Sequence, residues 1–299
     1  MAEKRKFYGM RNDYMFHAVL QKNEEVLRNL LATLLEIDEA EIESCHIENP
    51  IELGKEIEGK ECILDVKLTL NNDKVINIEL QVYKQTYWIN RSLLYWARTY
   101  DNLKSGQDYS MLLPAYHIGI LDFTLFENHP KFMAQYQILD VEDGYLYSDK
   151  LCIKVLDLTQ LEKAKQEPET NKKLLKWASI FKAETLEELE QLASGEEVFE
   201  NMVVTMKKLS EDEKIRMQCE AREDYERSLL TEYNAGKSEG IEQGIQQGIA
   251  SERGNTEKER QRAEKESQRA EKERQRAENE SQRADTLAAE VERLRALLK

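Results

Sequence analysis

Two alternating segments joined by a short turn constrain the fold of this chain more than any other feature. The segments ECILDVKLTL and KVINIELQVY alternate apolar and polar residues and are separated by Asn71-Asn72-Asp73. Alternation of this kind is typical of half-buried strands, and asparagine and aspartate favour the backbone of a tight turn. The pattern therefore predicts a β-hairpin within a larger sheet.

The length of the turn determines which residues of the two strands face each other. If Asn71-Asn72-Asp73 is a three-residue loop, Asp65 lies opposite Glu79, with Cβ atoms roughly 5 Å apart. The apolar face then carries Leu64, Val66, Leu68, Leu70, Ile76, Ile78, Leu80 and Val82. The polar face carries Asp65, Lys67, Asn77, Glu79 and Gln81. A different register would break this pairing.

The facing carboxylates of Asp65 and Glu79 indicate a metal site. They repel each other unless a cation bridges them. Mg²⁺ prefers carboxylate oxygens, keeps several waters and coordinates substrate phosphate, so the pair suits a hydrolytic magnesium centre. Gln81, two residues beyond Glu79 on the same face, is placed to hold the attacking water. The alternative is an ordinary solvent-facing side of an antiparallel sheet, where polar residues are expected in any case.

A helix is expected over residues 86–105, with one apolar side. That side carries Ile89, Leu93, Trp96, Tyr100 and Leu103, and the opposite side carries Tyr87, Arg91, Tyr95 and Arg98. Arg91 and Tyr95 are suited to contact a phosphate backbone. The alternative is a solvated helix face with tyrosine packing at its edge. Near the start of the chain, Asp13 precedes a helical stretch and is expected to be its N-terminal cap.

Further elements follow from periodicity and turn residues. Residues 24–36 (EEVLRNLLATLLE) have the spacing of an amphipathic helix, and the weakly polar segment 114–123 indicates a strand inside a sheet. Segments KFMAQYQILDV and YLYSDKLCIKVLDL flank Glu142-Asp143-Gly144 and predict a second hairpin. From about 159 to 235 the pattern is helical, with breaks near Pro168 and Gly195.

The sequence past residue 235 differs in kind. Glycines 236, 240, 244 and 248 are spaced four apart, which favours a hinge, or a close approach of two helices. Heptads such as ERQRAEK and ESQRAEK then repeat up to LAAEVERLRALLK. Pairs such as Arg262–Glu266 support an isolated helix, and only the last two heptads offer an apolar seam. We expect a charged single helix ending in a short coiled coil. The alternative is a solvated, partly disordered tail.

Composition limits the function. The formal net charge of −15 argues against a simple basic clamp for nucleic acid, so a DNA substrate would need local basic residues and bound cations. The four cysteines have no metal-binding spacing and are expected to be reduced thiols. We expect no signal peptide, because no apolar stretch follows MAEKRKFYGM, and no membrane span, because MLLPAYHIGILDF is short and interrupted. The expected location is the cytoplasm.

The order of these elements resembles the PD-(D/E)XK nuclease core. More narrowly, the chain is similar to the Rpn family of recombination-promoting nucleases and transposases. The residues carrying the resemblance are MRNDYMFHAVL, LDVKL, INIELQV and the run RSLLYWARTYDNLKSGQDYSMLLPAYHIGILDF. The glycine-rich GKSEGIEQGIQQG is also similar, so the resemblance covers roughly residues 7–250.

The resemblance implies an α/β fold, a mixed sheet flanked by helices, and magnesium-dependent cleavage of DNA. It implies Asp65 and Glu79 as metal ligands, and Asp13 matches an early acidic position of the family. Gln81 stands where the wider superfamily usually has lysine, and its amide cannot act as a base toward water. The lack of a proline before Asp65 is a second departure.

The expected organisation is a nuclease-like domain (1–160), a helical extension (161–235), a glycine-rich hinge (236–256) and a heptad-repeat helix (257–299). The leading function is a DNA endonuclease that forms homo-oligomers through its C-terminal coiled coil. The alternatives are a catalytically weak or inactive nuclease fold that binds DNA or protein, and a scaffold whose working part is the coiled coil.

Overall fold

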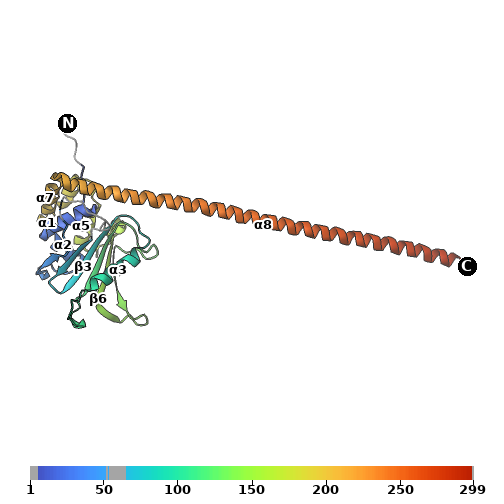
Figure 1. Cartoon of the computed structure of the whole chain (residues 1–299), viewed down its shortest axis with the longest axis horizontal. Coiled ribbons are helices and arrows are strands. Elements are labelled where there is room, and N and C mark those ends of the chain that lie inside the picture. The colour runs from blue at the N-terminus through green and yellow to red at the C-terminus, as the bar shows by residue number, and fades with distance from the viewer. Residues whose placement is uncertain (1–5, 52, 54–64, 298–299) are drawn as a thin grey trace, which may run out of the picture. The chain divides into compact units, whose positions relative to one another are not determined.

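The predicted hairpin lies within a six-stranded mixed sheet of order β1-β2-β3-β4-β6-β5 (Figure 1). The computed structural model describes residues 6–51, 53 and 65–297. Its strands are β1 (Cys45–Ile47), β2 (Val66–Leu70), β3 (Lys74–Gln81), β4 (Ala115–Leu121), β5 (Met133–Leu139) and β6 (Leu146–Asp157). Strands β3, β4 and β6 are parallel to one another, and β1, β2 and β5 pair with their neighbours in the antiparallel sense.

The register of the hairpin is the predicted one. Leu70 pairs with Lys74 and Val66 pairs with Ile78, so continuing the register places Asp65 beside Glu79. Asn71 and Asn72 have φ of 49° and 56°, a left-handed conformation that asparagine tolerates better than most residues. The predicted residues Ile63 and Leu64 lie outside the described part of the chain.

Helices cover both faces of the sheet. The helices of the described residues are α1 (Asp13–Lys22), α2 (Glu24–Leu35), α3 (Trp88–Tyr100), α4 (Leu161–Ala164), α5 (Lys172–Lys182), α6 (Leu186–Ala193), α7 (Glu197–Glu211) and α8 (Glu213–Leu297). Short 3-10 turns lie at Glu39–Glu41, Tyr109–Met111 and Leu158–Gln160. The predicted helix over 24–36, the second hairpin and the helical region after 159 are confirmed.

The main core lies between one sheet face and the N-terminal and post-sheet helices. The sheet contributes Ile76, Ile78, Ile118 and Ile120, and the helices contribute Phe16, Leu30, Trp177, Phe181 and Phe199. These side chains are almost completely buried, which is the largest favourable term in folding.

Helix α3 covers the opposite face of the sheet over a smaller cluster. Trp88 packs there with Leu121, Ile153 and Val155. The expected apolar side of this helix is confirmed only in part: Trp96 packs against the same cluster, but Ile89 and Leu93 are 40% and 47% exposed. The helix instead turns the side that carries Trp88, Ser92 and Thr99 toward the sheet. The polar face of β3 is therefore buried beneath a helix, and the solvent-facing alternative for it does not hold.

The long helix α8 begins against the sheet domain and includes the heptad region as far as Leu297. The chain divides into two compact units, Met1–Leu230 and Thr231–Lys299. The predicted charged helix is confirmed, but within its described residues α8 runs through the four glycines without a break where we expected a hinge. Among the described residues, no helix is both long and apolar enough to cross a membrane.

Candidate metal centre

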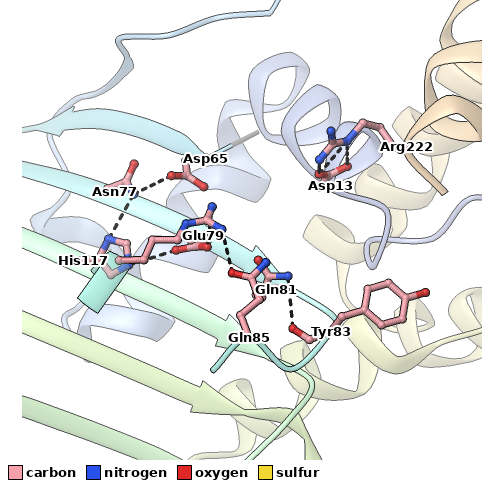
Figure 2. A network of polar contacts seen from close by, with 10 residues as sticks. Asp13, Asp65, Asn77, Glu79, Gln81, Tyr83, Gln85, His117 and Arg222 are labelled. Carbon is pink, nitrogen blue, oxygen red and sulfur yellow. Dashed lines mark hydrogen bonds and ion pairs between the residues drawn. The ribbon is translucent and has the colours of Figure 1, made fainter. Parts of the chain in front are cut away.

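Glu79 lies at the centre of a buried polar network on the face of the sheet covered by α3 (Figure 2). Its side chain is 1% exposed. Arg91 of α3 places Nη2 3.0 Å from Glu79 Oε1, and His117 of β4 places Nε2 3.4 Å from Glu79 Oε2. Strand β3 thus holds a carboxylate in the interior, with one guanidinium and one imidazole beside it.

Asp65 comes directly before β2 and shares this site. Asn49 fixes its backbone, since the Asn49 Nδ2 donates to the Asp65 carbonyl at 2.7 Å and its Oδ1 accepts from the Lys67 N–H at 2.9 Å. The Asp65 carboxylate accepts from Asn77 Nδ2 at 3.3 Å. Burial and then the charge of Glu79 raise the pKa of Asp65 to about 8, although Asn77 and Arg91 act in the opposite direction. The two carboxyl groups therefore cannot both ionise cheaply without a cation.

Several buried polar atoms at this site lack a hydrogen-bond partner among the described residues. They are both carboxylate oxygens of Glu79, Nε2 of His117, Nε of Arg91 and Nε1 of Trp88. The ion pair between Glu79 and Arg91 is close, but it lacks the alignment of a hydrogen bond. Buried polar atoms in folded proteins are nearly always satisfied, so such a cluster indicates a place that a ligand, ion or water completes.

The available donors fit a hard divalent cation. Asp65 and Glu79 offer carboxylate oxygens, which Mg²⁺ prefers, and magnesium commonly takes only one or two protein carboxylates. No group of three or more His, Cys, Asp or Glu side chains in the described ranges is arranged to hold a metal. The remaining coordination positions would go to water and substrate phosphate, as a phosphodiester-cleaving centre requires.

Gln81 and Asp13 lie near the pair without joining it directly. Gln81 follows Glu79 on the same face of β3, is half-buried, and donates to the Tyr83 carbonyl at 3.4 Å. Asp13 is held by a bidentate ion pair with Arg222 of α8, whose Nε lies 3.0 Å from both carboxylate oxygens (Figure 2). The charge of Asp13 still contributes to the raised pKa of Asp65.

The expectation that Asp13 caps its helix is wrong. Asn12 is the N-cap of α1, and its Oδ1 accepts from the Met15 N–H at 3.1 Å. Asp13 is instead the first residue of the helix, where a carboxylate is favoured by the helix dipole. Its side chain is therefore free of a capping role and turns to Arg222.

Arg91 and Tyr95 are also placed differently from expectation. The Arg91 side chain is only 14% exposed, and its Nη1 donates to Gln85 Oε1 at 3.0 Å while Nη2 faces Glu79. The Arg91 guanidinium carbon lies 5.1 Å from the centre of the Tyr95 ring, a cation–π contact. Both residues belong to the side of α3 that faces the site, rather than to a solvated side.

Three contributors to this region were not predicted. Asn77 lies on the predicted polar face of the hairpin but has no predicted role, and the sequence predicts no role for His117. Arg222 is 209 residues from Asp13 in the chain. A histidine inside an otherwise apolar strand was the available signal for His117, whereas nothing local could have connected Arg222 with Asp13.

Comparison with known proteins gives one match. A sequence model of the family described as PD-(D/E)XK nuclease family transposase matches residues 10–233. The matched range contains the hairpin, α3, the remaining strands of the sheet and the first part of α8. No curated protein and no solved structure matches the chain significantly.

Proposed function

Because the chain belongs to the PD-(D/E)XK nuclease family transposases, we propose that it is a Mg²⁺-dependent DNA endonuclease of recombination or mobile-element biology. One observation carries this proposal. Asp65 and Glu79 converge in a buried place where the Glu79 oxygens have no hydrogen-bond partner among the described residues. A buried carboxylate with a second, half-buried carboxyl group beside it is costly for a protein that has no use for a cation there.

The residues of the site have distinct roles in this proposal. Asp65 and Glu79 hold the metal, which when bound would activate a water and stabilise charge on the scissile phosphate. The Gln81 amide, two residues along β3 from Glu79, orients the water but cannot accept its proton as a base. Asp13 adds negative charge to the same region and has an auxiliary role in catalysis.

Arg91 and Tyr95 are assigned to the substrate phosphate. In the structure Arg91 neutralises Glu79, and a metal at Glu79 would replace that function of its guanidinium. The planar guanidinium would then be available for bidentate contact with a phosphate, with the Tyr95 ring supporting it. These local cations must counteract a chain of net charge −15, so we expect DNA binding to be weak without divalent metal.

We also propose self-association and a cytoplasmic location. Leu287 and Val291 in the last heptads of α8 are 64% and 47% exposed in the single chain, as coiled-coil seam residues would be before pairing. The described cysteines, at 45, 152 and 219, are free thiols, which fits a reducing compartment.

A binding module without catalytic activity is the second candidate. The ion pair between Glu79 and Arg91 and the amide at position 81 favour it, because a guanidinium already compensates the buried carboxylate. In that case the protein would bind DNA or protein partners through a nuclease fold that no longer takes up metal.

Magnesium-dependent nicking of supercoiled plasmid by the purified protein decides between the two candidates. The comparison includes Asp65→Ala, Glu79→Ala and, as a matched control, Asp73→Ala, which removes an exposed carboxylate from the turn of the same hairpin. We expect wild type and Asp73→Ala to nick DNA at similar rates. The nicking rates of Asp65→Ala and Glu79→Ala should be at least about 100-fold lower. Cleavage that survives both site variants would refute the assignment of the site. Absence of cleavage by wild type with Mg²⁺ and Mn²⁺ would favour the binding module.

A further inference from the structure

Asn77 and His117 lie side by side beneath the two carboxylates. Asn77 of β3 pairs with His117 of the parallel strand β4, and Asn77 lies two positions before Glu79 on β3. Both are buried: Asn77 is 6% exposed and His117 is fully enclosed. The rings of Trp88 and Tyr95 flank the imidazole, with centroids 5.9 and 6.4 Å away. Solvent therefore cannot set the protonation or orientation of His117, and its polar neighbours must do so.

The contacts of Asn77 determine which nitrogen of His117 carries the proton. Asn77 Nδ2 lies 3.3 Å from Asp65 Oδ2 and 3.2 Å from His117 Nδ1 (Figure 2). When Asp65 binds a cation its carboxylate only accepts, so the amide presents its NH₂ group to Asp65, and the second hydrogen of that group is directed at Nδ1. His117 Nδ1 is then an acceptor, and the neutral imidazole carries its proton on Nε2.

This tautomer directs a donor at Glu79. His117 Nε2 lies 3.4 Å from Glu79 Oε2, and neither atom has a hydrogen-bond partner among the described residues. The distance is longer than a good hydrogen bond, and contacts of this kind often shorten when a site is occupied. Arg91 is on the other oxygen, Oε1. A neutral donor on Oε2 can orient the carboxylate without neutralising the charge that a cation needs.

We infer that Asn77 and His117 form a positioning pair that orients Asp65 and Glu79 for a divalent cation, Asn77 by donating to Asp65 and His117 by donating to Glu79. The inference rests on the proposed function. Neither residue is a ligand in this arrangement, because Nε2 of His117 carries a proton and Asn77 presents nitrogen to the site. Groups that orient metal ligands in this way typically change metal affinity about 10–100-fold when they are removed.

The first test measures Mn²⁺ affinity by titration calorimetry of the full-length protein. We expect His117→Leu to weaken Mn²⁺ binding about 10–100-fold and His117→Gln, whose amide can donate from a similar position, to recover most of the loss. Tyr116→Phe is the matched control, because Tyr116 is on the same strand but packs against the main core on the opposite face. Its Mn²⁺ affinity should equal that of wild type, and thermal unfolding in EDTA checks the fold of every variant.

The second test reads the tautomer of His117 by ¹⁵N NMR in the protein saturated with Mg²⁺, where Asp65 is a carboxylate. We expect a proton on Nε2 in wild type and loss of that preference in Asn77→Leu. If His117→Leu does not fold, His117→Gln and the tautomer decide, and a wild-type proton on Nδ1 overturns the inference.

The calorimetric outcomes separate the two proposals. Wild type that binds no Mn²⁺ defeats the proposed function and the positioning pair together. Wild type that binds Mn²⁺ while His117→Leu binds equally well defeats the positioning pair alone, as does an equal loss in the folded leucine and glutamine variants.

Discussion

Asp65 lies where the hairpin brings it beside Glu79, and burial together with that charge raises its pKa to about 8. The ordinary pKa of an aspartate is 3.8, so the folded protein holds a proton on Asp65 over a wide pH range in which the unfolded chain releases it. The contribution of Asp65 to the free energy of unfolding of the metal-free protein therefore falls as pH rises from about 4 to about 8. The site is maintained at a cost in stability.

Asp65→Asn should stabilise the metal-free protein while removing its metal affinity. The amide does not ionise, so the cost of burying a carboxylate beside Glu79 disappears. We expect the melting temperature in EDTA at pH 8 to rise by roughly 2–4 °C, the shift that about 1 kcal/mol produces in a domain of this size. Added Mg²⁺ should raise the melting temperature of wild type but not of the variant. A variant that melts lower than wild type in EDTA would contradict this account.

Gly119 is a second residue whose substitution would disturb the site, because it has no room for a side chain. It pairs with Glu79 across β3 and β4, and a Cβ added there would lie 2.4 Å from Cζ2 of the buried Trp88. Gly119→Ala should therefore lower the free energy of unfolding by about 1–3 kcal/mol, measured by urea denaturation, because α3 must shift away from the sheet. Adding Trp88→Phe should give a smaller combined loss than the sum of the two single changes. Additive losses would show that the two residues do not interact.

At the scale of elements, the sequence predicts the hairpin well and the following helix poorly. The register follows from strict alternation and from the asparagines of the turn, both of which are local. For α3, amphipathic periodicity correctly identifies a helix and the packing of Trp96, but it places Ile89 and Leu93 on the covered side and Arg91 on the open side. The face that α3 covers carries Asn77, Glu79 and His117, so the side that packs there includes Arg91 and Tyr95. Amphipathic helices usually turn apolar residues toward the sheet, but because the site under α3 is polar, polar residues of this helix face the sheet as well.

The base of α8 is the element that sequence could not place. Besides Arg222, which binds Asp13, Cys219 of this helix accepts at its carbonyl from Asn12 Nδ2 at 2.9 Å. Glu226 is also part of this contact, and burial followed by the charge of Asp13 raises its pKa to about 7. These contacts join residues that are 207 and 209 positions apart in the sequence, and local periodicity carries no information about them.

Glu226, at the base of α8, should make the free energy of unfolding depend on pH. Between its ordinary pKa of 4.5 and about 7, the folded protein keeps a proton on Glu226 that the unfolded chain releases. Its contribution to the free energy of unfolding therefore falls as pH rises through this window. Glu226→Gln should match wild type near pH 4 and exceed it at pH 8 by on the order of 1 kcal/mol. Glu220→Gln, an exposed change on the same helix, should not alter the slope; equal slopes in all three proteins would contradict the assignment.

At the scale of the whole molecule, the heptads predict the long helix because each repeat supplies its own i, i+4 ion pairs. Arg260–Glu264 and Arg274–Glu278 form such pairs in the structure, at 3.3 and 3.2 Å. The four glycines do not interrupt the helix. Glycine lowers helix propensity without forbidding a helix, and α8 is continuous through all four positions.

Truncation after Ala250 tests the proposed assembly through α8. Light scattering of the full chain should give a multiple of 35.0 kDa, and the truncated protein should be a folded monomer, since the last apolar heptads are removed. Substituting Leu287 and Val291 by serine in the full chain should have the same effect if the coiled coil is the contact. A full chain that is monomeric would rule out the proposed assembly, and a truncated chain that still associates would place the interface elsewhere.

The ion pair between Arg91 and Glu79 has a consequence for how this protein is made in the cell. Metal binding is often coupled to folding, which ties the folding of such proteins to the supply of free ion. Here the chain carries its own counter-charge on α3, so a newly synthesised copy can complete its fold before it takes up metal. On the proposed function, we expect the protein to accumulate folded and metal-free, and to become active when an ion displaces Arg91 from Glu79.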